Sequence, residues 1–88
     1  MIRVSIPSPL HSYTRGLSAL ECEAGTLAEL AARLDSRFPG IRFRIIDEHD
    51  RIRRHIRFFV NQEMARDLQY PLAAGDEVMI VCALSGGV

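Results

Sequence analysis

The sequence contains no lysine, because all eleven of its basic residues are arginine. Eleven acidic residues balance them, so the formal net charge is zero. A chain with this balance has no strong general field that would draw it to nucleic acid or to an anionic membrane. We therefore expect its partners to be recognised by local features of the surface.

Long apolar runs are also absent. No stretch approaches the roughly 20 apolar residues that are needed to span a bilayer, and the first seven residues contain no long apolar run either. The 88 residues, 48% of them hydrophobic, are enough for one small domain with a real core and too few for two. We expect a soluble, cytoplasmic protein in which residues 1–88 form a single domain.

Cysteine is scarce, and the histidines are scattered. Cys22 and Cys82 each lie in an apolar, strand-like segment without a C-x-x-C or Cys/His spacing, which favours buried reduced thiols over a disulfide or a metal site. His11, His49 and His55 have no neighbouring grouping that indicates a metal or a nucleophile relay. The sequence thus predicts no metal site and no bound cofactor.

The start of the sequence predicts a β-hairpin. Residues 2–6 alternate apolar and polar side chains with a period of two, which is typical of a strand with one buried face. Pro7 and Pro9 end this strand. After a polar stretch, residues 17–23 alternate again, and we expect them to return as a second strand beside the first.

A helix follows the hairpin. Thr26-Leu27-Ala28-Glu29 has the pattern of a capping box, in which the Thr26 hydroxyl satisfies an amide of the first turn and Glu29 reaches back. Pro39-Gly40 stops the helix after about three turns. The apolar residues between these signals keep the i, i+3, i+4 spacing of one stripe: Leu27, Leu30, Ala31, Leu34 and Phe38.

Two further strands are expected in the second half. Residues 41–55 fit either a strand or a short second helix before a polar turn at 47–50. Residues 56–60 then read as a strand that ends at Asn61, before a short arm around Met64 and Ala65. Residues 77–84 form the last strand, whose two faces are both apolar; a buried central strand fits this pattern, and so does a strand with an outer face kept apolar for a partner.

Two adjacent glycines, Gly86 and Gly87, follow the last strand and precede Val88. At an average glycine usage of about 7%, glycines at two chosen positions occur together by chance roughly 0.5% of the time. Because glycine lacks a Cβ atom, such a tail can extend into a channel too narrow for other residues and present its carbonyl carbon to a nucleotide or nucleophile. The alternative is a frayed, flexible end.

The order of these elements implies an α+β domain in which a mixed sheet is crossed by one main helix. Its most informative segments are Val4-Ser5-Ile6-Pro7 with Leu10, Gly25-Thr26-Leu27, Phe59-Val60-Asn61, Pro71-Leu72, Gly75-Asp76-Glu77-Val78 and Gly86-Gly87. In this order they resemble the β-grasp fold of the ubiquitin-like sulfur carriers, the MoaD and ThiS family, and within it the carriers of the CysO type. The resemblance covers the whole chain.

The resemblance implies a protein cosubstrate rather than an enzyme. An ATP-dependent activating enzyme adenylates the terminal glycine carboxylate, and a sulfur donor converts the acyl adenylate to a thiocarboxylate. The carrier then gives this sulfur to a synthase that makes cysteine, a cofactor or a secondary metabolite. In this chain, Gly87 is the residue to be activated, and Gly86 is the steric partner that lets it enter the activating enzyme.

Val88 departs from this pattern, because such carriers finish at the second glycine. An acyl adenylate on a β-branched valine would crowd the carbonyl that sulfur must attack, so we expect a peptidase to remove Val88 first. The alternative is a degenerate paralogue that is never activated. A second departure is Cys82-Ala83-Leu84-Ser85, which stands where family members often carry prolines.

Two other functions fit the same fold. One is the small subunit of molybdopterin synthase, which uses the same chemistry but inserts its tail into a larger catalytic subunit. The other is a non-covalent β-grasp interaction module whose tail never reacts. Copurification with the larger subunit distinguishes the first, and incubation with ATP, sulfide and activating enzymes distinguishes the second.

The binding surface is expected on the outer side of the last strand. If Val78 and Ile80 face the core, then Met79, Val81 and the neighbouring Phe59 face outward beside the tail residues Leu84 and Ser85 and form a docking site for the activating enzyme. The arginines of the segment 42–57 are interleaved with acidic residues and lack paired aromatics, which favours a solvated face or contact with an acidic partner enzyme over nucleic acid.

Overall fold

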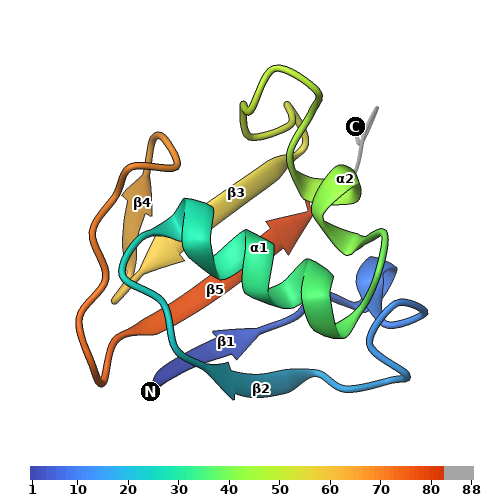
Figure 1. The fold of residues 1–88 in the computed structure, drawn as a ribbon, viewed down its shortest axis with the longest axis horizontal. Helices are drawn as coiled ribbons and strands as arrows, with labels where there is room; N and C mark the ends of the chain where they lie inside the picture. The colour runs from blue at the N-terminus through green and yellow to red at the C-terminus, as the bar shows by residue number, and fades with distance from the viewer. Residues whose placement is uncertain (83–88) are drawn as a thin grey trace.

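The computed structural model describes residues 1–82, in which five strands form one mixed sheet and a main helix crosses it (Figure 1). The α+β class predicted from the sequence is confirmed. The elements, in chain order, are β1 (Ile2–Ser5), the 3₁₀ turn η1 (Ser8–Leu10), β2 (Ala19–Cys22), α1 (Leu27–Arg37), α2 (Ile41–Ile45), β3 (Ile56–Val60), β4 (Glu63–Ala65) and β5 (Glu77–Cys82).

The last strand of the chain occupies the centre of the sheet, whose order is β2-β1-β5-β3-β4. β1 and β2 pair antiparallel, as the predicted hairpin requires, with Val4 opposite Leu20. β5 pairs in parallel with β1 and antiparallel with β3, and β3 continues antiparallel into β4. Placing β5 between β1 and β3 brings both halves of the chain together along the strand that leads to residues 83–88.

Helix α1 lies across one face of the sheet, which we call the inner face (Figure 1). Its stripe of Leu27, Leu30, Ala31 and Leu34 is buried, as predicted. The Thr26 hydroxyl accepts a hydrogen bond from the Glu29 amide at 3.2 Å. The Glu29 carboxylate in turn accepts one from the amide of Gly25 at 2.6 Å, one residue before the position of a standard capping box.

The core fills the space between α1 and the inner face. Alternate residues of each central strand point into it, so that Ile2 and Val4 of β1, Ile56 and Phe58 of β3 and Val78 and Ile80 of β5 are all at most 2% exposed. This alternation follows from the two-residue period of a strand. The opposite face of the sheet, which we call the outer face, carries the intervening residues.

The ambiguous segment 41–55 begins as a helix. α2 places Ile41 and Ile45 one turn apart on its buried side, whereas Phe43 between them is 57% exposed. A strand would have put all three residues on one face, so the observed burial requires the helical alternative. After α2 the chain makes a loop closed by an isolated bridge between Ile46 and Ile52.

Strand lengths differ slightly from the prediction. β2 is limited to residues 19–22 because the preceding residues form turns, in which Thr14 is fully buried and its hydroxyl donates a hydrogen bond to the carbonyl of Leu17 at 2.8 Å. β5 is described as far as Cys82. The predicted end of this strand at Leu84 and the predicted tail, including its flexibility, lie outside the described residues.

Candidate functional site

Four outer-face residues form one row across the sheet. Ser5 of β1 is opposite Met79 of β5, Met79 is opposite Phe59 of β3, and Phe59 is opposite Met64 of β4. Side chains in directly opposed positions of neighbouring strands contact one another, so the row is continuous. We call it the outer row; it consists of Ser5, Met79, Phe59 and Met64.

Three of the four side chains of the outer row are apolar, and its two methionines are accessible. Met79 is 51% exposed and Met64 is 43% exposed, while Phe59 between them is half-buried. Methionine has a flexible, polarisable side chain that adapts to differently shaped partners. The structure therefore brings together two of the predicted docking residues, Phe59 and Met79, on a surface that no helix of the described chain covers (Figure 1).

Val81, the third predicted docking residue, lies one row nearer to the tail. It is half-buried and stands opposite Arg57 of β3, whose side chain is exposed. The outer face thus changes from apolar to positively charged in the direction of residues 83–88. The remaining predicted site residues, Leu84, Ser85, Gly86, Gly87 and Val88, lie outside the described residues.

Met64 and Ser5 belong to this surface but were not predicted as site residues. Met64 reaches Phe59 because Asn61 and Gln62 form a two-residue turn in which both have positive φ, 50° and 76°. A turn of this kind fixes the register of the two strands it joins. Only two residues separate the apolar run 56–60 from residues 63–65. This spacing is the signal in the sequence that identifies Met64 as a neighbour of Phe59. Ser5 lies there because β1 pairs with β5, which no local pattern indicates.

A hydrogen-bonded corner holds the turn against the start of β5. The Asn61 side chain donates to the Asp76 carboxylate at 2.9 Å and accepts from the Glu77 amide at 3.0 Å. The Asp76 carboxylate also accepts from the Ala73 amide at 2.8 Å. The hydrogen bonds from the Ala73 amide and the Asn61 side chain lower the pKa of Asp76, because they favour its charged form.

This corner forms one wall of an open groove of about 470 Å³ on the outer face. Phe59 and Met79 line its apolar side, and Asn61, Gln62 and Glu77 line its polar side. A concave surface with both kinds of side chain suits a projecting residue of a protein partner. The geometry of this groove therefore supports docking.

The end of β5 lies beside α2 (Figure 1). Cys82 is a half-buried free thiol opposite Ile56 of β3. Burial raises the pKa of this thiol, and the nearby positive charge of Arg44 partly offsets the increase. Cys22, also a free thiol, is buried in β2, and burial likewise raises its pKa. Both thiols are thus disfavoured as thiolate nucleophiles.

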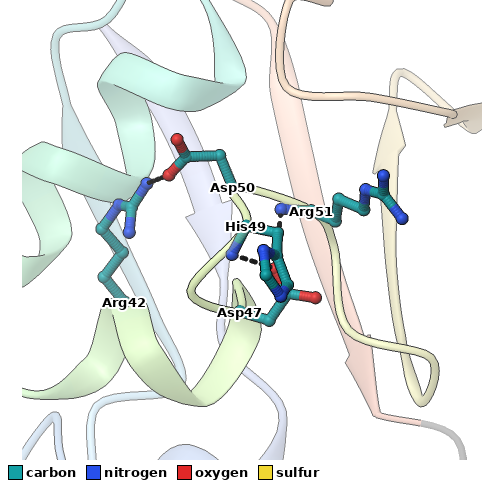
Figure 2. A network of polar contacts seen from close by, with 5 residues as sticks. All are labelled: Arg42, Asp47, His49, Asp50 and Arg51. Carbon is teal, nitrogen blue, oxygen red and sulfur yellow. Dashed lines mark hydrogen bonds and ion pairs between the residues drawn. The ribbon is translucent and has the colours of Figure 1, made fainter.

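The loop after α2 engages its own acidic residues (Figure 2). The Asp47 carboxylate accepts hydrogen bonds from the amides of His49 and Arg51, at 2.8 Å and 3.0 Å. Asp50 forms an ion pair with Arg42 at 2.9 Å. Figure 2 shows Asp50 directed toward Arg42, whereas the Arg51 side chain extends from the other side of the loop.

The described residues contain neither a cluster of metal ligands nor a membrane-spanning helix. Within residues 1–82, His, Cys, Asp and Glu side chains form no group of three that could hold a metal ion. Over the same residues, every helix is too short or too polar to cross a membrane. The Nε2 atom of His11 lies 2.9 Å from the carbonyl oxygen of Ile6, so this histidine has a hydrogen-bonding role within the fold.

Comparison with known proteins gives consistent matches over nearly the whole chain. The family model described as ThiS family matches residues 4–87. The sulfur carrier protein CysO of Mycobacterium tuberculosis is 31% identical over 91 residues, covering 98% of both chains.

Solved structures agree with these matches. A chain in the crystal structure of the Amycolatopsis orientalis BexX/CysO complex superimposes with a TM-score of 0.91 at 31% identity, covering 99% of this chain and all of that one. The crystal structure of Mycobacterium tuberculosis CysO gives a TM-score of 0.89 at 28% identity, covering 96% of this chain and all of that one. The predicted β-grasp fold is thereby confirmed, and so is the resemblance on which it was based.

Proposed function

The chain belongs to the ThiS family of ubiquitin-like sulfur carriers, and we propose that Gly87 is the residue on which it carries sulfur, as a C-terminal thiocarboxylate. One observation carries this proposal above the others: the match to the family extends to residue 87, the second glycine, and stops there. Carriers of the CysO type are small protein cosubstrates, so the chemistry is performed by an enzyme that binds this chain.

The proposed reaction has two steps. The Gly87 carboxylate attacks the α-phosphate of ATP, displaces pyrophosphate and forms an acyl adenylate. A sulfur donor at the oxidation level of sulfide then attacks the carbonyl carbon and expels AMP, which leaves a thiocarboxylate. ATP is bound by the activating enzyme, and this chain supplies the carboxylate and the surface that positions it.

Glycine at positions 86 and 87 suits the first step. Two residues without Cβ atoms allow the tail to enter a narrow channel and bring the carboxylate close to the nucleotide. In the sequence Val88 follows, so we propose that a peptidase removes it before activation. A valine carboxylate would place a branched Cβ next to the carbonyl that sulfur must attack.

The outer row is the proposed docking surface for the activating enzyme. Its two methionines are exposed, and Met79 lies on β5, the strand that leads directly to residues 83–88. Such a surface, with charged residues at its margin, has the composition of a protein interface. A relative supports the general arrangement, since the Amycolatopsis orientalis structure is that of a complex between BexX and CysO.

The test compares two forms of the protein, one ending at Gly87 and one ending at Val88. Each is incubated with ATP, sulfide and the activating enzyme of the host, and its mass is measured. The form ending at Gly87 should gain about 16 mass units as sulfur replaces oxygen, whereas the form ending at Val88 should react only after trimming. Gly87→Ala in the shorter form should react slowly, because a Cβ enters the channel.

The results of this test distinguish the need for trimming from the carrier proposal itself. Equal conversion of both forms would show that trimming is not required. If neither form reacts with any activating enzyme of the host, the carrier proposal gives way to the non-covalent interaction module.

A sulfur-accepting synthase completes the proposed cycle by taking the sulfur and releasing the Gly87 carboxylate. The comparisons do not favour the molybdopterin synthase subunit or the interaction module.

A further inference from the structure

A second groove, distinct from that beside the outer row, lies where β3 begins. It has a volume of about 380 Å³ and is lined by eight residues, four of which are arginines and none acidic. We call it the arginine groove; its charged residues are Arg53, Arg54, Arg57 and Arg66, and its most accessible apolar residue is Met64.

These arginines are not neutralised within the described chain. In residues 1–82, the arginines that form ion pairs are Arg33, with Glu29, and Arg42, with Asp50, and neither lines the groove. The carboxylates of the neighbouring acidic loop are engaged mainly outside the groove. Asp47 accepts hydrogen bonds from amides of the loop itself, and the charge of Arg53 makes only the smallest contribution to lowering its pKa. Asp50 pairs with Arg42 (Figure 2), and Glu48 lies 3.9 Å from His49.

Two of the guanidinium groups are held in place by backbone carbonyls. Arg57 donates to the carbonyl of Arg54 at 2.6 Å and to that of Ile56 at 3.0 Å. Arg53 donates to the carbonyl of Phe43 at 2.7 Å and lies over its ring, 4.6 Å from the centroid. Bonds of this kind orient the positive charges without cancelling them. A cluster of like charges repels itself, and the carboxylates of a partner would relieve that repulsion.

The chemistry of the groove favours a protein over a nucleic acid. Its eight lining residues include no aromatic ring on which a base would stack, and the exposed ring nearby, Phe43, already has a guanidinium over it. The formal net charge of zero provides no general attraction for phosphates. Met64 and Ile52 give the groove an apolar part, which suits a segment with an apolar side chain among its carboxylates.

The groove adjoins the outer row. Met64 belongs to both, and Arg57 stands opposite Val81, one row from Phe59 and Met79. We propose that the arginine groove receives an acidic segment of the activating enzyme, carrying one apolar side chain, while the outer row binds the same enzyme through apolar contacts. This inference rests on the proposed function and adds to it the chemistry of the partner surface.

The test measures binding of the protein ending at Gly87, the form proposed to react, to the purified activating enzyme by calorimetry. Every variant is made in this form, and the unsubstituted protein ending at Gly87 is the wild type of the comparison. Arg54→Gln/Arg66→Gln is the informative variant, because neither side chain donates a hydrogen bond within residues 1–82. Arg15→Gln/Arg33→Gln is the matched control, since it removes the same charge from the loop before β2 and from α1. Thermal unfolding of both variants verifies that they are folded.

We expect the groove variant to weaken binding about five-fold or more and the control variant less than two-fold, as is typical for charges inside and outside an interface. Raising the salt concentration from about 0.05 to 0.5 M should weaken wild-type binding more than that of the groove variant, because salt screens exposed charges. KM for thiocarboxylate formation should rise in parallel, with kcat unchanged.

Other results would overturn the inference. Equal weakening in the two variants would attribute the effect to net charge, and unchanged affinity would exclude the groove from the interface. If the unsubstituted protein ending at Gly87 binds the enzyme but never gains about 16 mass units, the proposed function fails and the two variants still decide whether the groove lies in the interface; if it does not bind, both fail. An oligonucleotide of about 20 residues that binds wild type but not the groove variant, with enzyme affinity unchanged, would reassign the groove to nucleic acid.

Discussion

The two faces of β5 carry similar residues in different surroundings. Val78 and Ile80 are 1% and 2% exposed beneath α1, whereas Met79 between them is 51% exposed. An apolar side chain on the inner face contributes to stability by leaving water when the chain folds. One on the outer face makes that contribution only when a partner covers it. The difference indicates which residues serve the fold and which are available for binding.

β3 allows the sharpest comparison, because two phenylalanines stand next to each other on opposite faces. Phe58 is fully buried and Phe59 half-buried. Phe58→Ala should reduce the free energy of unfolding by about 3 to 5 kcal/mol, a large part of the about 5 to 15 kcal/mol of a whole domain. Denaturant unfolding measures this loss. A smaller loss for Phe58→Ala than for Phe59→Ala would reverse the assignment of the two faces.

The inner face can also be disrupted from the helix. Leu34 is fully buried, and Leu34→Ala should reduce the free energy of unfolding by about 2 to 5 kcal/mol. Arg33→Ala, next to it on the exposed side of α1, should change the value by about 0.5 kcal/mol or less. Equal denaturant midpoints for Leu34→Ala and wild type would show that α1 does not cover the core as described.

The outer face should respond to mutation in binding rather than in stability. Phe59→Ala should weaken the complex with the activating enzyme by about 1 kcal/mol or more if Phe59 is a central anchor, and it should destabilise the fold less than Phe58→Ala does. Calorimetry on the protein ending at Gly87 gives the affinity, and denaturant unfolding gives the stability. Unchanged affinity together with a large loss of stability would assign Phe59 to the core.

The elements that the sequence predicted well are those fixed by local patterns. The period of two in β1, the capping box before α1 and the apolar stripe along α1 each depend on neighbouring residues, and each was found where expected. The alternation in β5 likewise predicted that Met79 faces away from Val78 and Ile80. Which face would be covered was only a condition in the sequence analysis, and the burial of Val78 and Ile80 decides it.

Features that depend on distant residues were not predictable in the same way. Ser5 joins the outer row through the parallel pairing of β1 with β5, whose contacting residues are more than 70 positions apart. The helical form of Ile41–Ile45 was left open because its isoleucines fit both periods, and only the exposure of Phe43 decides between them. The corner formed by Asn61 and Asp76 joins two turns that no short motif connects.

Mutation of this corner should have the smallest effect on stability of those considered, and it tests what shapes the groove beside the outer row. Hydrogen bonds from the Ala73 amide and the Asn61 side chain lower the pKa of Asp76. A carboxylate with a lowered pKa stabilises the fold fully above its unfolded value of about 3.9, and this contribution is lost as the pH falls through the folded value. Thermal unfolding should therefore show stability decreasing below about pH 4, and less steeply in Asp76→Asn.

Asp47 has a lowered pKa for a similar reason, so Asp76→Asn should keep part of the decrease in stability with falling pH. If Asp76→Asn retains the full slope, the corner does not hold its carboxylate as described, and the groove beside the outer row must be shaped by the strands alone.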